Sequence, residues 1–453
     1  MKLPRTPRPL AELIVDHRDR LDKVFSQRLG PTVDGRYLHW DKLRHLALPA
    51  GMQSPEEWWL ALKLARTGLY RELPLRDTGG RPFVYLLSDG VHEALHRIDS
   101  QSHGWIGAAA HGVANTDTRN QFIVNSLIEE AIASSQLEGA STTRAVAAEM
   151  IRAGRRPRDR SEQMILNNYL AMDAIRRLRD KSLTDDAVMD LHTMITTDTL
   201  DDPDDAGRVQ RPADQRVLVW DTRDQTVLHS PPPADDLAGR MREMVRFANR
   251  GPVDGSFLHP VLHAIVLHFW LAYDHPFADG NGRTARALFY WAMLHHKYWM
   301  FEFASISNVL TKAPGQYARS FLHTETDDND LTYFFEHQLG VILRAIADVE
   351  SYITRKTEQV RQVEETLKRS TNLNHRQLAL LAHAIRHPNA EYTIRSHMTS
   401  HTVAYATARA DLFRLADLGL LERRRVGRRS YLFWPPPDLA DRIRSAPSAK
   451  TAS

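Results

Sequence analysis

The segment from residue 258 to residue 297 constrains the fold most strongly. Residues 258–274 are almost wholly apolar at helical spacing. The residues that carry this pattern are Val261, Leu262, Ile265, Val266, Phe269 and Trp270. A helix without a polar face has to be buried among other helices. A glycine-rich loop follows, and then a second helical pattern at about 283–297. We therefore expect a buried helix, a tight loop and a second helix at the centre of the fold.

Most of the remaining chain is also predicted to be helical. Apolar residues at helical spacing indicate further helices. These helices are expected at 118–138, 162–180, 185–199 and 234–249, with two or three more between 305 and 368. Residues 1–115 mix aromatic and charged segments, which is typical of amphipathic helices. Residues 216–230 differ, because two β-rich runs flank a polar turn and predict a hairpin.

Composition excludes several kinds of site. The chain has 453 residues and no cysteine, which excludes disulfides, thiolate zinc sites and cysteine nucleophiles. No run of about 18 apolar residues and no signal peptide is visible, so we expect a cytoplasmic protein without a membrane span. Residues 371–453 hold 13 Lys/Arg against 6 Asp/Glu, a net charge of +7. The total is +3, so the rest of the chain carries about −4, and a basic module at the C-terminal end is indicated.

The loop between the two central helices combines several chemical groups. Gly280-Asn281-Gly282 permits a tight turn, and the free N–H groups at the start of the next helix favour an anion. Arg283 and Arg286 share one helix face and suit a polyphosphate. Asp279 offers the hard oxygen that Mg²⁺ prefers, and His275 is a base near neutral pH. The alternative is a helix–loop–helix turn with a solvated charged face, but a single loop with all these groups favours a site.

The segment from His275 to Arg286 resembles the signature of the Fic (filamentation induced by cAMP) family, His-x-Phe-x-(Asp/Glu)-Gly-Asn-Gly-Arg-x-x-Arg. Every defined position is present, including Phe277, and the resemblance extends over about 118–345. It implies a mainly α fold with a Fic-type helical core at 116–345. It also implies transfer of AMP from ATP to a Ser, Thr or Tyr hydroxyl of a target protein, and to the chain itself.

The resemblance assigns a role to each residue of the loop. His275 would deprotonate the target hydroxyl, and Asp279 would hold Mg²⁺ or Mn²⁺ across the phosphates. Gly280, Asn281, Gly282 and Arg283 would hold the phosphates, while Arg286 would clamp the γ-phosphate. These roles amount to positioning and charge neutralisation.

Two further segments receive roles from the same resemblance. The hairpin at 216–230 corresponds to the family's flap, which aligns the target backbone and covers the nucleotide. Its contact residues would be Val227, Leu228, His229 and Ser230. Tyr317 is the candidate adenine neighbour, although the family's paired tyrosines and asparagine are otherwise missing. Some relatives transfer UMP or phosphocholine, so adenine specificity is less secure than triphosphate binding.

An inhibitory motif precedes the signature. Ser134-Ser-Gln-Leu-Glu138-Gly139 matches the family pattern (Ser/Thr)-x-x-x-Glu-(Gly/Asn), within a predicted inhibitory helix at 118–139. Ser134 and Glu138 lie on one helix face, and Gly139 ends the helix. In the family the glutamate pairs with the second arginine, here Arg286, and blocks productive ATP binding. The alternative is a solvated glutamate at a helix end. In some relatives the same glutamate orients the water that removes AMP, and the sequence leaves the two directions open.

The basic C-terminal segment resembles a winged helix-turn-helix at 372–440, joined by a helical linker at 346–371 and followed by a tail at 441–453. Three helices, near 373–387, 393–399 and 402–418, precede two strands around a Val-Gly turn. The candidate DNA contacts are Tyr405, Thr407, Arg409, Arg424, Arg425, Arg428 and Arg429. The alternatives to DNA binding are a module for protein contacts and a basic solvated face. For the whole chain, an alternative to the enzyme is a DNA-binding regulator whose Fic core senses ATP.

Three smaller expectations complete the sequence analysis. Family members often self-associate, so a homodimer is expected. The sequence does not indicate the target protein. Four histidines, His192, His259, His263 and His268, are interpreted as helix-packing residues. The arginines from Arg152 to Arg160 are interpreted as a solvated loop.

Overall fold

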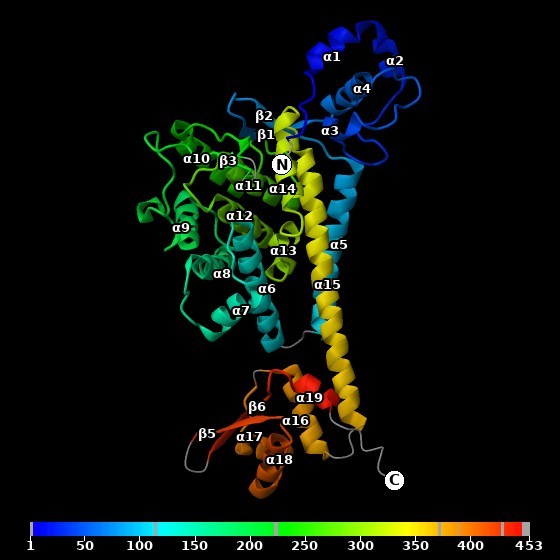
Figure 1. Cartoon of the computed structure of the whole chain (residues 1–453). Helices are drawn as coiled ribbons and strands as arrows, with labels where there is room; N and C mark the ends of the chain where they lie inside the picture. Colours follow the sequence, from blue (N-terminus) through cyan, green and yellow to red (C-terminus); the bar gives the residue numbers. More distant parts are fainter. Residues whose placement is uncertain are drawn as a thin grey trace. The chain divides into compact units, whose positions relative to one another are not determined.

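The computed structural model describes residues 3–112, 116–221, 225–369, 373–388, 390–426 and 430–445, and the fold is mainly α. The chain forms two compact units, one of residues 1–103 with 125–346 and one of residues 104–124 with 347–453 (Figure 1). No helix of the described residues has the length and apolar character needed to cross a membrane.

The first unit contains most of the helices. Its N-terminal elements are α1 (Leu10–Asp16), α2 (Leu21–Ser26), α3 (Trp40–Leu43), α4 (Pro55–Thr67), β1 (Arg71–Arg76) and β2 (Pro82–Tyr85). Its core elements are α7 (Arg144–Ala153), α8 (Arg160–Leu178), α9 (Asp185–Thr196), β3 (Val219–Trp220), β4 (Val227–His229), α10 (Ala234–Arg250), α11 (Pro260–Asp274), α12 (Asn281–His295), α13 (Ile306–Leu310) and α14 (Pro314–Thr326). Three helices have residues in both units: α5 (Asp89–Gly112), α6 (Thr116–Leu137) and α15 (Thr332–Arg369).

The paired helices α11 and α12 form the centre of this unit, with α8, α9 and α10 beside them (Figure 1). Thirteen of the 15 residues of α11 are buried, and so are 13 of the 15 in α12. The apolar pattern of α11 leaves no face for solvent, which explains its central position. The predicted buried helix is therefore confirmed, and the loop at 275–280 is held between two rigid elements.

The N-terminal region includes a hairpin that the sequence analysis did not foresee. Strands β1 and β2 pair antiparallel, and Leu73 and Leu75 of β1 are buried at alternate positions. The hairpin continues into the core through hydrogen bonds between Val84 and residues 329–331. Lys63 of α4 also donates to the Asp327 carboxylate at 2.8 Å in a buried ion pair. These contacts attach the N-terminal region to the segment between α14 and α15.

The predicted hairpin at 216–230 contains the short antiparallel strands β3 and β4. Val219 pairs with His229, and Trp220 pairs with Val227. Residues 222–224 lie outside the described part of the chain. The base of the hairpin is attached to the central loop, because Arg216 donates hydrogen bonds to the carbonyl oxygens of Asp274 and His275.

The second unit has its own hydrophobic core. Its elements beyond α15 are α16 (His375–Arg386), α17 (Ile394–His401), α18 (Tyr405–Asp417), β5 (Glu422–Arg425), β6 (Tyr431–Trp434) and α19 (Leu439–Ser445). Leu412 and Phe433 are fully buried in this core, and β5 pairs antiparallel with β6. Three helices followed by a two-stranded hairpin thus occur in the predicted order. Helix α19 adds a turn of regular structure that extends into the predicted tail.

Candidate functional site

The loop between α11 and α12 has a backbone that few sequences allow. His275 ends α11 in the left-handed region with φ +46°, and Gly280 precedes α12 with φ +81°. A side chain at Gly280 would also place its Cβ 2.7 Å from Thr196 Cγ2, so glycine is required there. The Asn281 side chain closes the loop, because it accepts from the N–H of Phe277 and donates to its carbonyl. The loop is therefore rigid, and the first amides of α12 face its open side.

His275 is held as a neutral imidazole. Its Nδ1 lies 3.3 Å from the carbonyl oxygen of Ala272, a contact in which Nδ1–H donates and Nε2 is left as the basic nitrogen. Burial lowers the pKa of His275 to about 4, and the Ala272 carbonyl opposes this shift only in part. The ring is thus ready to accept a proton at neutral pH.

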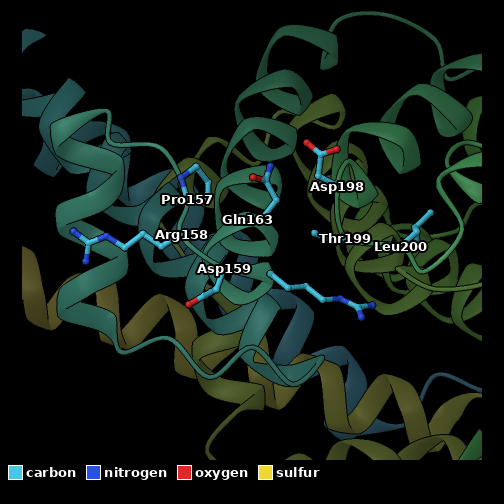
Figure 2. Close-up of a pocket in the computed structure, with 8 residues that line it drawn as sticks. Pro157, Arg158, Asp159, Gln163, Asp198, Thr199 and Leu200 are labelled. Carbon is cyan, nitrogen blue, oxygen red and sulfur yellow. The ribbon is translucent and has the colours of Figure 1, made fainter.

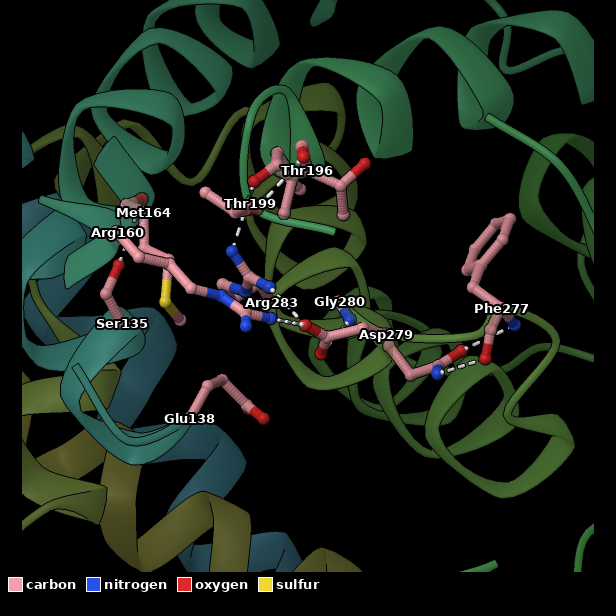
Figure 3. Close-up of polar contacts among 12 residues, drawn as sticks. Ser135, Glu138, Arg160, Met164, Thr196, Thr199, Phe277, Asp279, Gly280 and Arg283 are labelled. Carbon is pink, nitrogen blue, oxygen red and sulfur yellow. Dashed lines mark hydrogen bonds and ion pairs between the residues drawn. The ribbon is translucent and has the colours of Figure 1, made fainter. Parts of the chain in front are cut away.

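Asp279 and Arg283 form the second part of the site (Figure 3). The Asp279 side chain is 43 % exposed, and its Oδ2 lies 3.5 Å from Arg283 Nη2. Arg283 is fully buried and donates from Nη1 to the carbonyl of Ile195 at 3.1 Å. Its Nε has no hydrogen-bond partner among the described residues. A buried donor without an acceptor is costly, so this arginine is suited to an anion that supplies one.

Arg286 faces the end of helix α6. Its Nε donates to Ser134 Oγ at 2.9 Å, and its Nη2 donates to the Ser134 carbonyl at 2.9 Å and to Glu138 Oε1 at 2.8 Å. A Cβ at Gly282 would collide with Glu138 Oε1, so the carboxylate lies directly over the start of α12. Gly139 follows with φ +94°, which turns the chain after α6. The structure therefore brings Ser134 and Glu138 into direct contact with Arg286 of the signature.

The ionisation of this pair is coupled. Burial raises the pKa of Glu138, but the Arg286 guanidinium outweighs it and the pKa ends below its ordinary value. Burial lowers the pKa of Arg286, and Glu138 in turn raises it above the ordinary value. Both groups are therefore charged at neutral pH.

The four predicted flap residues line a small cavity. His229 bonds through Nε2 to the Tyr273 carbonyl and through Nδ1 to Glu325, both at 2.7 Å. Burial lowers the pKa of His229, but the Glu325 carboxylate outweighs it and raises the pKa. Val227 and Leu228 are half-buried, and Ser230 is exposed. All four residues line a cavity of about 280 Å³.

Tyr317 lies in an aromatic cluster with His268, Phe321 and Phe334. Its hydroxyl is 2.7 Å from His268 Nε2, and its ring packs against Phe321. The predicted adenine neighbour therefore contacts the central helix α11 as well as α14.

Sequence reasoning did not connect His192 with the site. His192 Nδ1 accepts from the N–H of Gly207 at 2.9 Å, so its Nε2–H donates to the Asp279 carbonyl at 2.8 Å. The ring also stacks on Phe277 with the centroids 3.7 Å apart. Burial lowers the pKa of His192 to about 4, so it stays neutral. His192 is a packing residue of α9, and it supports the loop that carries Asp279.

A further open cavity of about 290 Å³ adjoins the start of α8 (Figure 2). Arg158, Arg160, Gln163 and Thr199 contribute to its lining. Arg160 reaches Asp279 from this side, with Nη2 3.7 Å from Oδ2. One member of the supposedly solvated arginine cluster thus belongs to the site, and no sequence spacing indicated it.

The candidate DNA contacts belong to the second unit. Tyr405 is 49 % exposed, Thr407 is half-buried, and Arg409 lies over the Phe413 ring at 4.3 Å. Arg424 and Arg425 are exposed on β5. Arg428 and Arg429 lie outside the described residues.

Comparison with known proteins supports one domain assignment. Residues 182–293 match the model of the Fic/DOC family. The "Protein adenylyltransferase Fic" of Nematostella vectensis is 34 % identical over 110 residues, which is 24 % of this chain and 22 % of that protein. The protein of that name from Drosophila melanogaster is 47 % identical over 60 residues, 13 % of this chain and 12 % of the relative. The chain thus spans about a fifth or less of these relatives' length.

Two solved structures are also similar. A Fic family protein from Desulfovibrio desulfuricans G20 has a TM-score of 0.48 at 19 % identity, over 76 % of this chain and 96 % of that one. Residues 134–508 of Fic-1 from C. elegans give a TM-score of 0.45 at 17 % identity, over 58 % of this chain and 71 % of that one. The family match at 182–293 includes the loop and all but the last two residues of α12, and on that match the chain contains a domain of the Fic/DOC family.

Proposed function

We propose that this chain is an autoinhibited protein adenylyltransferase, which moves AMP from ATP to a Ser, Thr or Tyr hydroxyl of a target protein and of itself. The family match and the names of the partial relatives support this activity. The observation that carries the proposal is the loop itself. It combines neutral His275, accessible Asp279 and buried Arg283 at the start of α12.

The chain's own residues account for each part of the transfer. His275 Nε2 takes the proton of the target hydroxyl, whose oxygen forms a bond to the α-phosphorus. The bond from that phosphorus to the bridging oxygen breaks, and pyrophosphate leaves. The first amides of α12 and the free Nε of Arg283 hold the phosphate oxygens as charge develops on them. His275 belongs to the same rigid loop that would bind the phosphates, so the loop aligns the base with the reacting groups.

The residues present also fit a magnesium ion, which Asp279 would hold. Asp279 offers one accessible carboxylate, and the described residues contain no cluster of three or more His, Cys, Asp or Glu suited to a metal. Mg²⁺ in nucleotide sites takes one or two carboxylates and completes its shell with phosphates and water. When bound, such an ion neutralises charge on the phosphates. His192 fixes the Asp279 backbone, so the carboxylate is presented in one orientation.

The contact between α6 and α12 supports the inhibitory role of Ser134, Glu138 and Gly139. Arg286 donates hydrogen bonds from Nε and Nη2 to Ser134 and Glu138, so these donors are not free for a γ-phosphate. Glu138 also places a negative charge over Gly282, where the phosphates would lie. ATP in a productive pose therefore requires Glu138 to move. The same position would let Glu138 orient water, so removal of AMP from a modified protein is the second candidate.

The second unit is proposed to bind DNA as a winged helix-turn-helix. The support is the exposed arginine pair Arg424 and Arg425 on β5 and the exposed Tyr405 at the start of α18. A mobility shift that persists in a chain lacking residues 371–453 would contradict this assignment.

Mass spectrometry after incubation with ATP and Mg²⁺ tests the enzymatic proposal. We expect AMP on a hydroxyl side chain of the chain itself, weakly in the wild type and not in H275A. Wild-type protein added to isolated, automodified protein tests the second candidate, which predicts loss of AMP. A chain that gains no AMP under any of these conditions, even with Glu138 replaced by Gly, would contradict the transferase proposal.

A further inference from the structure

Arg160 is a third guanidinium at the site, and neither the signature nor the inhibitory motif includes it. It is the first residue of α8, where Asp159 caps the helix. Its Nη2 lies 3.7 Å from Asp279 Oδ2, and its Nη1 lies 3.0 Å from Asp201 Oδ1. Arg160 therefore contacts the Asp279 carboxylate inside the site (Figure 3) and the Asp201 carboxylate outside it.

We infer that Arg160 is the resident counter-ion of Asp279, and that it weakens the hold of the site on a divalent cation. The inference rests on the proposed function, which assigns the metal to Asp279. A guanidinium and a divalent cation compete for the same carboxylate oxygen, and they repel each other at short range. Arg160 therefore acts as a positioning residue for Asp279 before the nucleotide is bound.

Both oxygens of Asp279 are engaged within the chain. Oδ1 accepts from the N–H of Gly280, and Oδ2 lies between the guanidinium groups of Arg160 and Arg283. A cation that binds Oδ2 must displace or crowd one of these groups. Arg283 is fully buried and bonded to the Ile195 carbonyl, so it cannot withdraw. Arg160 is the group that can move.

The surroundings of Arg160 allow that movement. Its side chain is 55 % exposed and contributes to the lining of the open cavity of about 290 Å³ at the start of α8. Asp201 is 95 % exposed and already accepts from Arg160. When Asp279 takes a cation, Arg160 can keep its second partner. Loss of the contact with Asp279 therefore does not leave a charge unpaired.

The size of the effect follows from exposure. Ion pairs between exposed groups contribute about 0.2–1 kcal/mol, which corresponds to a factor of about 1.4 to 5 in a binding constant. Arg160 and Asp279 are both about half exposed. Because neither side chain is fully exposed, we expect the upper part of this range, a change of about two- to fivefold in metal affinity when Arg160 is neutralised, and not an all-or-none effect.

The experiment compares ATP affinity with and without metal in full-length protein. The parent carries E138G and H275A, so the inhibitory contact is absent and ATP is not consumed. Isothermal titration gives the dissociation constant for ATP in EDTA and in saturating Mn²⁺. The constant in EDTA divided by the constant in Mn²⁺ measures the metal contribution. We expect R160Q to raise this ratio two- to fivefold. D201N is expected to lower this ratio, because Arg160 then loses the Asp201 carboxylate and keeps only its contact with Asp279 of these two.

A matched control is R158Q, which removes a guanidinium from the same cavity lining without a contact to Asp279. It should leave the ratio unchanged, and circular dichroism establishes that each variant is folded. An unchanged ratio in R160Q overturns the inference. Equal weakening of ATP binding in EDTA and in Mn²⁺ also overturns it, because Arg160 would then hold a phosphate. A parent that binds no ATP in either buffer overturns the proposed function itself, and is distinguishable from both results.

Discussion

Two ion pairs flank the start of α12, and they differ in burial. Arg286 and Glu138 lie 2.8 Å apart, with side chains 2 % and 28 % exposed. Arg160 and Asp279 lie 3.7 Å apart, with side chains 55 % and 43 % exposed. The first pair holds the proposed phosphate clamp, and the second holds the proposed metal ligand. Each functional charge of the resting site is therefore neutralised from within the chain, but to a different degree.

The difference shows which pair can act as a brake. A buried pair is costly to break, because the remaining charge loses both its partner and its solvent, at about 3–5 kcal/mol. An exposed pair is replaced by water at little cost. We therefore expect Glu138 to determine whether the site works, and Arg160 to adjust how much metal it needs.

The largest expected effect comes from E138G. Hydrogen bonds to charged groups contribute about 1.5–3 kcal/mol, so freeing Arg286 should raise automodification about 10- to 100-fold. The same change leaves Arg286 buried without its carboxylate, so the melting temperature should fall and then recover with ATP. Intact-mass kinetics and thermal unfolding with and without ATP measure the two effects.

E138Q is the matched variant for this comparison. It keeps the length of the side chain and one acceptor oxygen but removes the charge, so we expect an intermediate rate. Equal rates in E138G, E138Q and the wild type would show that the buried pair is not the brake.

A smaller increase is expected from S134A. Ser134 Oγ accepts a hydrogen bond from Arg286 Nε, and one such bond contributes about 1 kcal/mol. We therefore expect automodification to rise about fivefold, through partial release of Arg286. S135A is the control, because Ser135 lies on the same helix but donates to the Met164 carbonyl instead. If both serine variants behave alike, the effect comes from helix stability and not from Arg286.

The two pairs also differ in how far the sequence revealed them. Glu138 and Arg286 each belong to a recognisable motif, so the resemblance predicted their contact before the structure was known. Arg160 precedes Asp279 by more than a hundred residues and begins α8 directly after a loop of similar arginines, so only the fold selects it. The support by His192 was missed for the same reason, since a buried histidine on a helix has no distinctive spacing.

Secondary structure shows the same dependence on tertiary context. The apolar period of α11 predicted both its type and its burial, because no other arrangement hides such a surface. Strands β1 and β2 were missed, although Leu73 and Leu75 alternate with polar neighbours. Proline within β1 is unusual for a strand, and the hydrogen bonds to residues 329–331 that stabilise the hairpin are not local.

High salt should change the effects of the two pairs differently, by a factor of about two. Exposed charges are screened with a Debye length of about 10 Å at 0.1 M salt and 3 Å at 1 M, whereas buried pairs are screened much less. The twofold or larger difference in metal contribution between R160Q and its parent should therefore shrink at 1 M NaCl. The ratio of E138G to wild-type automodification, measured in the same buffers, should change little. Equal loss of both differences would mean that the two pairs are equally accessible to salt.

The smallest effect is expected from pH between 5.5 and 8. Burial raises the pKa of Glu138, but Arg286 outweighs it and leaves the pKa below the ordinary value of 4.5. A lowered carboxylate pKa means that the pair is fully present above 4.5 and is lost only as pH falls through the folded value. His275 has a pKa of about 4, so it also stays neutral over this range.

Protonation of the γ-phosphate near pH 6 changes the nucleotide in the same way for every variant, so it cancels from a ratio. The ratio of E138G to wild-type automodification, taken from initial rates at four pH values, should therefore be constant within about twofold, as expected if neither protein group titrates. A ratio that approaches one as pH falls from 6.5 to 5.5 would mean that acid releases Glu138. The carboxylate would then behave as an exposed group, and the contrast between the buried and the exposed pair would fail at its buried end.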